Sequence, residues 1–368
     1  KSLGNGIGPL EIIDQYGADA LRLTLITGNA PGNDMRFYYE RVENSRNFAN
    51  KVWNASRFIM MNMDGKQVTE PEFKELQPVD RWILSRLNTL IGEVTDNMES
   101  FELGIAVQKV YDFIWDEFCD WYIEMVKPRL YDTDDAASQN AALWTLKTVL
   151  IDALKLLHPY MPFITEEIYC TIRAMEGAAM EGAAMEGAAG EESIMISAWP
   201  KYREDRAFTK EEKDIEIIKE AVRGIRNVRN EMNVAPSRKA AVYVVSGDEG
   251  ILSAFTEGKL FFASLAYASE VTIQKDKSGI AGDAVSVVIP GATLYIPFAE
   301  LVDIAQEIER LKKEKNRLEG ELARVNGMLS NERFISKAPE SKIAEEKEKL
   351  SKYTRMMEQV ETRLTQLG

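Results

Sequence analysis

One face of a helix predicted over residues 37–63 carries an unusual combination of six amide, basic and aromatic side chains. They are Asn47, Asn50, Lys51, Asn54, Arg57 and Phe58. Because a helix turns about 100° per residue, the residues of the opposite face form a second set, which we expect to be buried. That set comprises Val42, Ser45, Ala49, Val52, Trp53, Ser56 and Met60.

The side chains of the first face suit contacts with unpaired nucleotides. Amides hydrogen-bond the edges of bases, an aromatic ring stacks on their faces, and Lys or Arg contacts phosphates. Asparagine is a weak helix former, so three asparagines on one exposed face lower the stability of the helix. The alternative is that Phe58 packs against a neighbouring helix and the polar side chains are merely solvated.

Two arginines of a helix predicted over 209–233 are further candidates. Arg226 lies at the edge of the apolar stripe of this helix, and Arg229 lies within the stripe. A buried charge is costly unless it is paired, so we expect Arg229 to have a structural partner or to lie at an interface.

Three other reactive side chains carry weaker signals. Cys119 lies among aromatic residues, and nothing near it in the sequence would lower the pKa of its thiol. His158 precedes a proline and is expected to end a helix. Lys1 adjoins a glycine-rich loop and a helix start, where it could contact a phosphate.

Composition limits the classes of protein that remain. The 368 residues include 45 basic and 59 acidic side chains, so the net charge is −14. No apolar run approaches the roughly 18 residues that span a membrane. Two cysteines and one histidine are too few for a disulfide framework or a Cys-rich zinc site, so no metal is expected. The chain therefore reads as cytoplasmic. Its acidic total does not exclude nucleic acid, because nucleic acids bind local patches.

The elements expected to position these residues make the fold mainly α. Helices predicted near 37–63, 78–99, 103–127, 135–157 and 162–174 indicate an antiparallel bundle. A repeated Met-Glu-Gly-Ala-Ala segment comes next, which we interpret as a mobile surface insertion. Four β-branched segments and a helix near 248–265 predict a small α+β unit.

Two heptad arrays in the last 68 residues predict an antiparallel coiled-coil hairpin. Lys315 and Glu346 are the polar exceptions in the two apolar seams. The predicted parts are thus residues 1–36, the bundle over 37–200 with its insertion at 175–190, the α+β unit over 201–300, and the coiled coil over 301–368.

Several of these segments resemble the class I aminoacyl-tRNA synthetases. Residues 1–7 are similar to the end of the Lys-Met-Ser-Lys-Ser signature and the residues directly after it. Residues 48–58 are similar to the first helix of the anticodon-binding domain in bacterial valyl enzymes, and residues 118–124 and 158–167 fit the same subgroup. A C-terminal coiled-coil arm with a turn like residues 334–339 also resembles the valyl enzymes.

The resemblance implies a fold and a set of roles. Residues 1–36 would be the end of the signature loop and a stem-contact segment, and residues 37–200 the anticodon-binding domain. The arm over 301–368 would touch the outer corner of the tRNA. Lys1 would be a catalytic remnant that contacts ATP phosphates in the parent enzyme, which uses ATP with Mg²⁺. The six residues of the helix face, with Arg226, would bind tRNA(Val).

The catalytic core of the family is missing from the sequence. There is no His-Ile-Gly-His signature, nucleotide-binding core or editing domain, so the resemblance implies a C-terminal fragment that is inactive alone and holds no cofactor. A monomer is expected. The alternatives are a fragment of an isoleucyl or leucyl enzyme, or a helical scaffold that binds proteins through its coiled coil.

Overall fold

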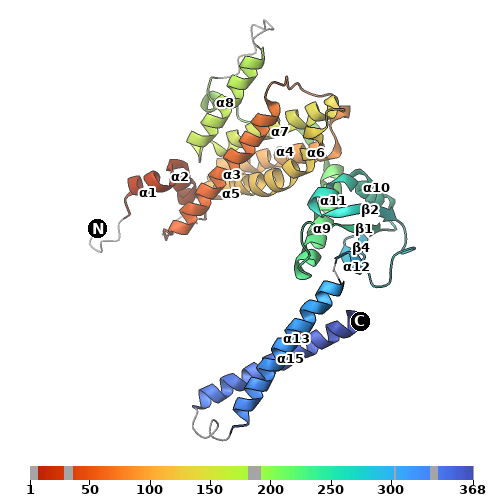
Figure 1. The fold of residues 1–368 in the computed structure, drawn as a ribbon. Helices are drawn as coiled ribbons and strands as arrows, with labels where there is room; N and C mark the ends of the chain where they lie inside the picture. The colour runs from red at the N-terminus through yellow and green to blue at the C-terminus, as the bar shows by residue number, and fades with distance from the viewer. Residues whose placement is uncertain (1–6, 29–35, 181–191, 302–303, 332–338, 368) are drawn as a thin grey trace. The chain divides into compact units, whose positions relative to one another are not determined.

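The computed structural model describes residues 7–28, 36–180, 192–301, 304–331 and 339–367 (Figure 1). The chain divides into two compact units. The first comprises Lys1–Glu220 and Ser253–Leu265, and the second comprises Ala221–Leu252 and Ala266–Gly368. The four-part division expected from the sequence stays a prediction.

Helices build the first unit. Up to Met180 they are, in chain order, α1 (Pro9–Tyr16), α2 (Ala18–Ile26), α3 (Tyr39–Met63), α4 (Pro78–Glu99), α5 (Leu103–Asp112), the π-helix η2 (Phe113–Tyr122), α6 (Ile123–Tyr131), α7 (Ala136–Leu157) and α8 (Pro162–Met180). The unit also contains α11 (Lys259–Leu265). Short 3₁₀ turns occur at Phe73–Glu75, Ile194–Ile196 and Glu204–Arg206. The repeat segment begins inside α8, and residues 181–191 lie outside the described residues. The mobility expected of the insertion is therefore untested.

The start of α4 shows how the sequence fixes an element of the bundle. Pro78 occupies the first turn, where its missing N–H costs nothing. Gln77 and Asp80 form a reciprocal capping box. The helix then buries Trp82 and Leu87 in the bundle core. Each large apolar side chain buried in this way contributes about 1.5–3 kcal/mol.

One predicted helix is wrong in its bounds and its type. The segment expected as a single helix over 103–127 is α5, η2 and α6 in succession, and it ends at Tyr131. A π-helix has a wider turn than an α-helix, so a search for a 3.6-residue period does not reveal it. The segment is rich in aromatic residues, and this apolar content does not distinguish an α-helix from a π-helix.

Buried polar contacts hold η2 and α6 to α4. The Tyr122 hydroxyl and the Arg129 guanidinium each donate to Oδ1 of Asp80 at 2.8 Å. Arg129 also donates to the Ser138 hydroxyl at 2.8 Å. Asp80 is fully buried, so these donors replace the water that its carboxylate loses.

The second unit contains a four-stranded sheet in the order β2-β1-β4-β3. The strands are β1 (Ala240–Val245), β2 (Ala268–Gln274), β3 (Val285–Ile289) and β4 (Ala292–Ile296). β1 pairs with β2 in parallel and with β4 antiparallel, and β3 and β4 form the predicted hairpin. At its turn Gly291 has a φ of +76°, which favours glycine.

The helices that precede and interrupt these strands along the chain differ in part from the prediction. The helix α9 runs over Thr209–Glu231. The single helix expected over 248–265 is two helices, α10 (Glu249–Glu257) and α11 (Lys259–Leu265). They separate at Gly258, where a Cβ atom would lie 2.3 Å from the Ile218 side chain. A larger residue at this break would therefore require the Ile218 side chain to move.

The coiled-coil hairpin is confirmed. After the short α12 (Phe298–Leu301), α13 (Ile304–Leu329) and α15 (Glu340–Leu367) lie side by side (Figure 1). Leu318 and Val325 are fully buried in their seam. Lys315 reaches across the seam, and its Nζ lies 2.7 Å from a carboxylate oxygen of Glu361. The predicted turn over 331–339 falls mostly outside the described residues.

Candidate nucleotide-binding face

The polar face predicted on α3 is largely exposed. Asn47, Asn50, Asn54 and Arg57 have exposed side chains, and none of them hydrogen-bonds or ion-pairs with another described residue. The opposite face packs in the core for the most part: Val42, Ser45, Val52, Ser56 and Met60 are buried. Ala49 and Trp53, which were also expected there, are half-buried. Four of the six candidate side chains therefore have free polar groups that point away from the bundle. We call the six-residue set the α3 face.

Lys51 differs from its prediction. Its Nζ lies 2.6 Å from Oδ1 of Asp120 and 3.8 Å from the centre of the Trp115 ring. The lysine is thus half-buried, with its charge neutralised by a carboxylate and a ring face beneath it. The tRNA-binding role expected of Lys51 stays a prediction, and a phosphate at this position would have to compete with Asp120.

Phe58 is half-buried rather than the exposed plate that the sequence suggested. The Nζ of Lys127 on α6 lies 5.6 Å from the centre of its ring. The interpretation that Phe58 packs against a neighbouring helix is therefore correct for part of the ring. The exposed remainder still borders Asn54, one turn earlier on α3.

The contacts of Lys51 and Phe58 give the α3 face two distinct sides. Both side chains point toward η2 and α6. The nearby exposed carboxylates are Asp112, at the end of α5, and Asp116 and Asp120 on η2. Burial raises the pKa of the Asp116 carboxyl, and the neighbouring Asp112 and Asp120 raise it further. Helical spacing places Asn50 and Arg57 on the side away from these carboxylates. A phosphate backbone would therefore be repelled from the η2 side and attracted to the Arg57 side.

Sequence reasoning missed two side chains that extend the α3 face. Met61 is 69% exposed and falls on the same arc as Asn54 and Phe58. Asn44 is exposed and extends the arc toward the start of α3. The same helical-wheel arithmetic applied over the whole of α3 would have found both.

The remaining candidates lie elsewhere or are structural. Lys1 lies outside the described residues. Arg226 is half-buried on α9, in the second unit. Arg229 is buried as expected, and its Nη2 donates to the carbonyls of Ala235 and Arg238 at 2.9 and 2.6 Å. Its partners are thus backbone carbonyls rather than an acid.

Cys119 and His158 both have structural settings. Burial raises the pKa of the Cys119 thiol to about 12, so little nucleophilic thiolate forms at neutral pH. His158 caps α7, and its Nδ1 lies 2.7 Å from the Thr165 hydroxyl. Burial lowers the pKa of this imidazole. Neither group has the partners of a catalytic nucleophile or base.

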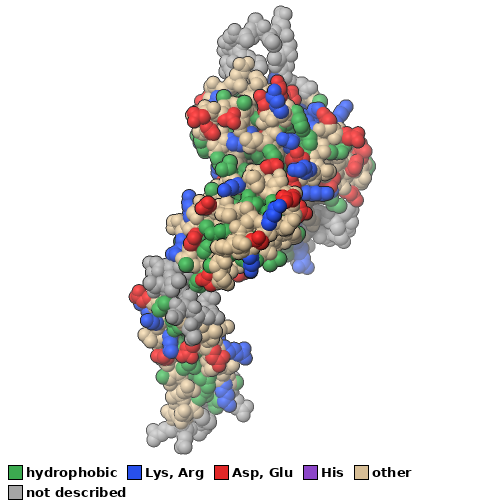
Figure 2. All heavy atoms as spheres, turned by 90° about the vertical axis from the view of Figure 1, so that its right-hand side faces the viewer, with side chains coloured by type: hydrophobic (Ala, Val, Ile, Leu, Met, Phe, Trp, Pro, Cys, Tyr) green, Lys and Arg blue, Asp and Glu red, His purple; other side chains and the backbone are tan. Residues whose placement is uncertain are grey.

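Two further kinds of site are not found within the described ranges. No group of three or more His, Cys, Asp or Glu residues there is arranged to hold a metal ion. None of the helices in these ranges is both long and apolar enough to cross a bilayer. On the side of the molecule in Figure 2, acidic and basic side chains are interspersed. The net charge is therefore not gathered into one acidic patch on this side.

Three family profiles match the chain. Residues 1–38 match tRNA synthetases class I (I, L, M and V), residues 80–244 match the anticodon-binding domain of tRNA ligase, and residues 303–368 match the valyl tRNA synthetase tRNA binding arm. The α3 face lies between the first two matched segments. Its assignment therefore rests on its own geometry.

Curated relatives match over the full chain. The valine–tRNA ligase of Clostridium tetani is 53% identical over 369 residues, that of Clostridium perfringens is 52% identical, and that of Carboxydothermus hydrogenoformans is 41% identical. Each match covers 100% of this chain and 40% of the relative, so the chain spans less than half the length of these ligases. The chain belongs to the valyl branch of the class I tRNA synthetases.

Proposed function

We propose that this chain is the tRNA-docking part of an enzyme that attaches valine to tRNA(Val) with ATP in the cytoplasm. The α3 face contacts the unpaired anticodon, Arg226 adds a cation in the second unit, and the arm over residues 301–368 contacts the outer corner of the tRNA. Docking places the acceptor end of the tRNA in the active site of the parent enzyme. The observation that carries the proposal is the set of exposed, uncommitted amides and Arg57 beside the partly exposed Phe58 ring.

The proposed chemistry at the α3 face follows from its two sides. Arg57 lies on the side away from the η2 carboxylates, so it attracts the phosphate backbone. Asn47, Asn50 and Asn54 then meet base edges, and the exposed part of Phe58 meets a base face. Lys51 is the sixth residue of the proposed contact surface, and its ion pair with Asp120 competes with any phosphate that it would bind.

ATP and Mg²⁺ enter this proposal only through the parent enzyme. Lys1 is the residue of this chain expected to contact an ATP phosphate, and it lies outside the described residues. ATP supplies the activation of the valine carboxylate when it is bound. The chain by itself is proposed to bind tRNA without activating valine.

The test is the affinity of the chain for tRNA(Val) at fixed salt. Arg57→Ala and Phe58→Ala should each weaken binding by about 1–3 kcal/mol, the range for loss of one base or phosphate interaction. Phe58→Leu keeps most of the apolar volume, so it separates loss of the ring face from loss of packing.

Arg203→Ala is the matched control for charge. Arg203 is exposed and its guanidinium pairs with Asp205 at 2.7 Å, so its removal should leave tRNA affinity unchanged. Unaltered binding by both Arg57→Ala and Phe58→Ala would sink the assignment of the α3 face. Tighter binding of tRNA(Ile) or tRNA(Leu) than of tRNA(Val) would instead reassign the substrate.

A further inference from the structure

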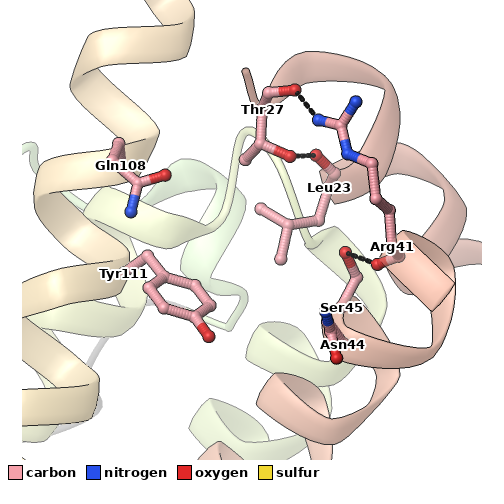
Figure 3. Close-up of a pocket in the computed structure, with 7 residues that line it drawn as sticks. All are labelled: Leu23, Thr27, Arg41, Asn44, Ser45, Gln108 and Tyr111. Carbon is pink, nitrogen blue, oxygen red and sulfur yellow. Dashed lines mark hydrogen bonds between the residues drawn. The ribbon is translucent and has the colours of Figure 1, made fainter. Parts of the chain in front are cut away.

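A cavity of about 260 Å³ lies at the start of the α3 face, between α2, α3 and α5. Its lining comprises Leu23 and Thr27 from the α2 end, Arg41, Asn44 and Ser45 from α3, and Gln108 and Tyr111 from α5 (Figure 3). All of these residues belong to the first unit. Neither the sequence motifs nor the proposed anticodon contacts account for this cavity.

The walls of the cavity combine an apolar and an aromatic surface. Leu23 is buried and forms the aliphatic wall. The Tyr111 ring points into the cavity from α5 (Figure 3). The Phe48 ring is stacked on it, with the two ring centres 4.3 Å apart. The aromatic wall is therefore positioned before any ligand binds. A flat, aromatic ligand matches walls of this kind.

Polar groups that are not used by the fold converge on the same space. The Asn44 amide and the Tyr111 hydroxyl form no hydrogen bond with another described residue. The Gln108 Nε2 donates to Oδ1 of Asp112 at 2.8 Å, which leaves its carbonyl oxygen free to accept. The cavity thus offers donors and acceptors at its mouth and apolar surface within, the pattern that a nucleobase requires.

Other polar groups of the cavity are committed to the scaffold. Nη2 of Arg41 donates to the Thr27 carbonyl at 2.5 Å, and the Ser45 and Thr24 hydroxyls lie 2.8 Å apart. These contacts tie α2 to α3 and keep the cavity from collapsing. A second cavity of about 290 Å³ shares Gln108 and reaches Lys109.

We propose that this cavity receives one unpaired nucleobase of the tRNA at a position outside the anticodon. The inference rests on the proposed function, and it adds a second base-binding position to the same helix. From Asn44 to Phe58 the axial separation is 14 residues, or about 21 Å at 1.5 Å per residue. That span is several nucleotides long, so the base in the cavity and the base at Phe58 are not neighbours.

The test combines variants of the protein with variants of the RNA. A series of tRNA(Val) transcripts is made, each lacking a single base outside the anticodon but keeping its sugar and phosphate. Wild-type chain should bind one of these abasic tRNAs about 5- to 150-fold more weakly than intact tRNA, as expected when one base no longer stacks. The double variant Asn44→Ala/Gln108→Ala should show a smaller difference between that abasic tRNA and intact tRNA, because it loses the amide contacts to the base and keeps only the Tyr111 and Leu23 walls.

Arg57→Ala separates this inference from the proposed function. It should weaken binding of every tRNA in the series while keeping the penalty at the one abasic position. Both altered side chains of the double variant are exposed, so its helix content by circular dichroism should match the wild type. Equal abasic penalties in wild type and double variant would overturn the cavity alone. A wild-type chain that binds no tRNA would overturn both proposals.

Discussion

At the scale of single residues, the ion pair between Lys51 and Asp120 decides what the α3 face offers a nucleic acid. The pair places a neutralised lysine at the boundary between the polar side chains of α3 and the carboxylates of η2. An exposed pair of this kind contributes only about 0–1 kcal/mol to stability. If the α3 face binds RNA as proposed, the pair weakens phosphate binding there, because it occupies a cation and adds an acidic neighbour.

The first prediction at this scale concerns Asp120→Asn. Removal of the carboxylate charge frees the Lys51 ammonium for a phosphate, so the chain should bind tRNA(Val) more tightly. Each added phosphate contact steepens the plot of log affinity against log salt by about 0.7–0.9. A salt titration of tRNA binding measures both effects. Asp132→Asn serves as the control, since Asp132 is exposed and pairs with no described cation. Equal salt slopes in the two variants would mean that Lys51 does not face the RNA.

The residues of the α3 face also show which properties the sequence can predict and which it cannot. Helical spacing correctly identified Asn47, Asn50, Asn54 and Arg57 as exposed, because exposure on a regular helix follows from angle alone. It did not identify the partners of Lys51 and Phe58, which come from η2 and α6, more than 60 residues later in the chain. Such contacts depend on which helices pack together, and a periodicity along one helix does not contain that information.

At the scale of elements, the π-helix and α6 form the wall beside the α3 face, and their position depends on buried polar contacts. Phe48 and Trp115 bring α3 and η2 together through a shared ring cluster with Tyr111. Asp80 on α4 accepts hydrogen bonds from Tyr122 on η2 and from Arg129 on α6. The sequence predicted the helices because their apolar periodicity continues over many residues. It did not predict the π-helix, because a search for a 3.6-residue period does not reveal one. Nor did it predict the break at Gly258, where the chain packs against Ile218.

The prediction for this element is a large loss of stability in Arg129→Met. The change leaves the fully buried Asp80 carboxylate without its cation, and broken buried pairs typically cost about 3–5 kcal/mol. Lys127→Met is the matched control on the same helix. Its pair with Glu124 is partly exposed, so its loss should cost no more than about 1 kcal/mol. Urea denaturation followed by tryptophan fluorescence compares the two, and equal midpoints would contradict a supporting role for the Asp80 cluster.

At the scale of the whole molecule, the charge is divided unevenly along the chain. Residues 301–368 carry 14 basic and 13 acidic side chains, a net charge of +1, so the other 300 residues carry −15. An acidic protein that binds RNA must do so through local cations, and the arm has the most favourable balance. The apolar seam of the arm is closed within one chain by α13 and α15.

The last prediction tests whether the two units bind one tRNA together. Lys352 and Arg355 on α15 are exposed and form no ion pair with another described residue. Lys352→Ala/Arg355→Ala should weaken tRNA(Val) binding and reduce the magnitude of the salt slope by about 1 for each phosphate that the variant no longer binds. The matched control is Arg317→Ala on α13, because Arg317 is already paired with Glu314 at 2.6 Å.

The arm variant combined with Arg57→Ala tests whether both sites bind the same tRNA or the arm binds RNA separately. The Arg57 and arm sites lie in different units and share no side-chain partner among the described residues, so their effects on binding free energy should add within about 0.5 kcal/mol if both contact the same tRNA. If the arm binds RNA separately, the combined variant should lose no more affinity than whichever of the two separate variants binds tRNA more weakly. Additive losses with a one-to-one complex would establish that anticodon and outer corner are held at once, as an enzyme that must orient a whole tRNA requires.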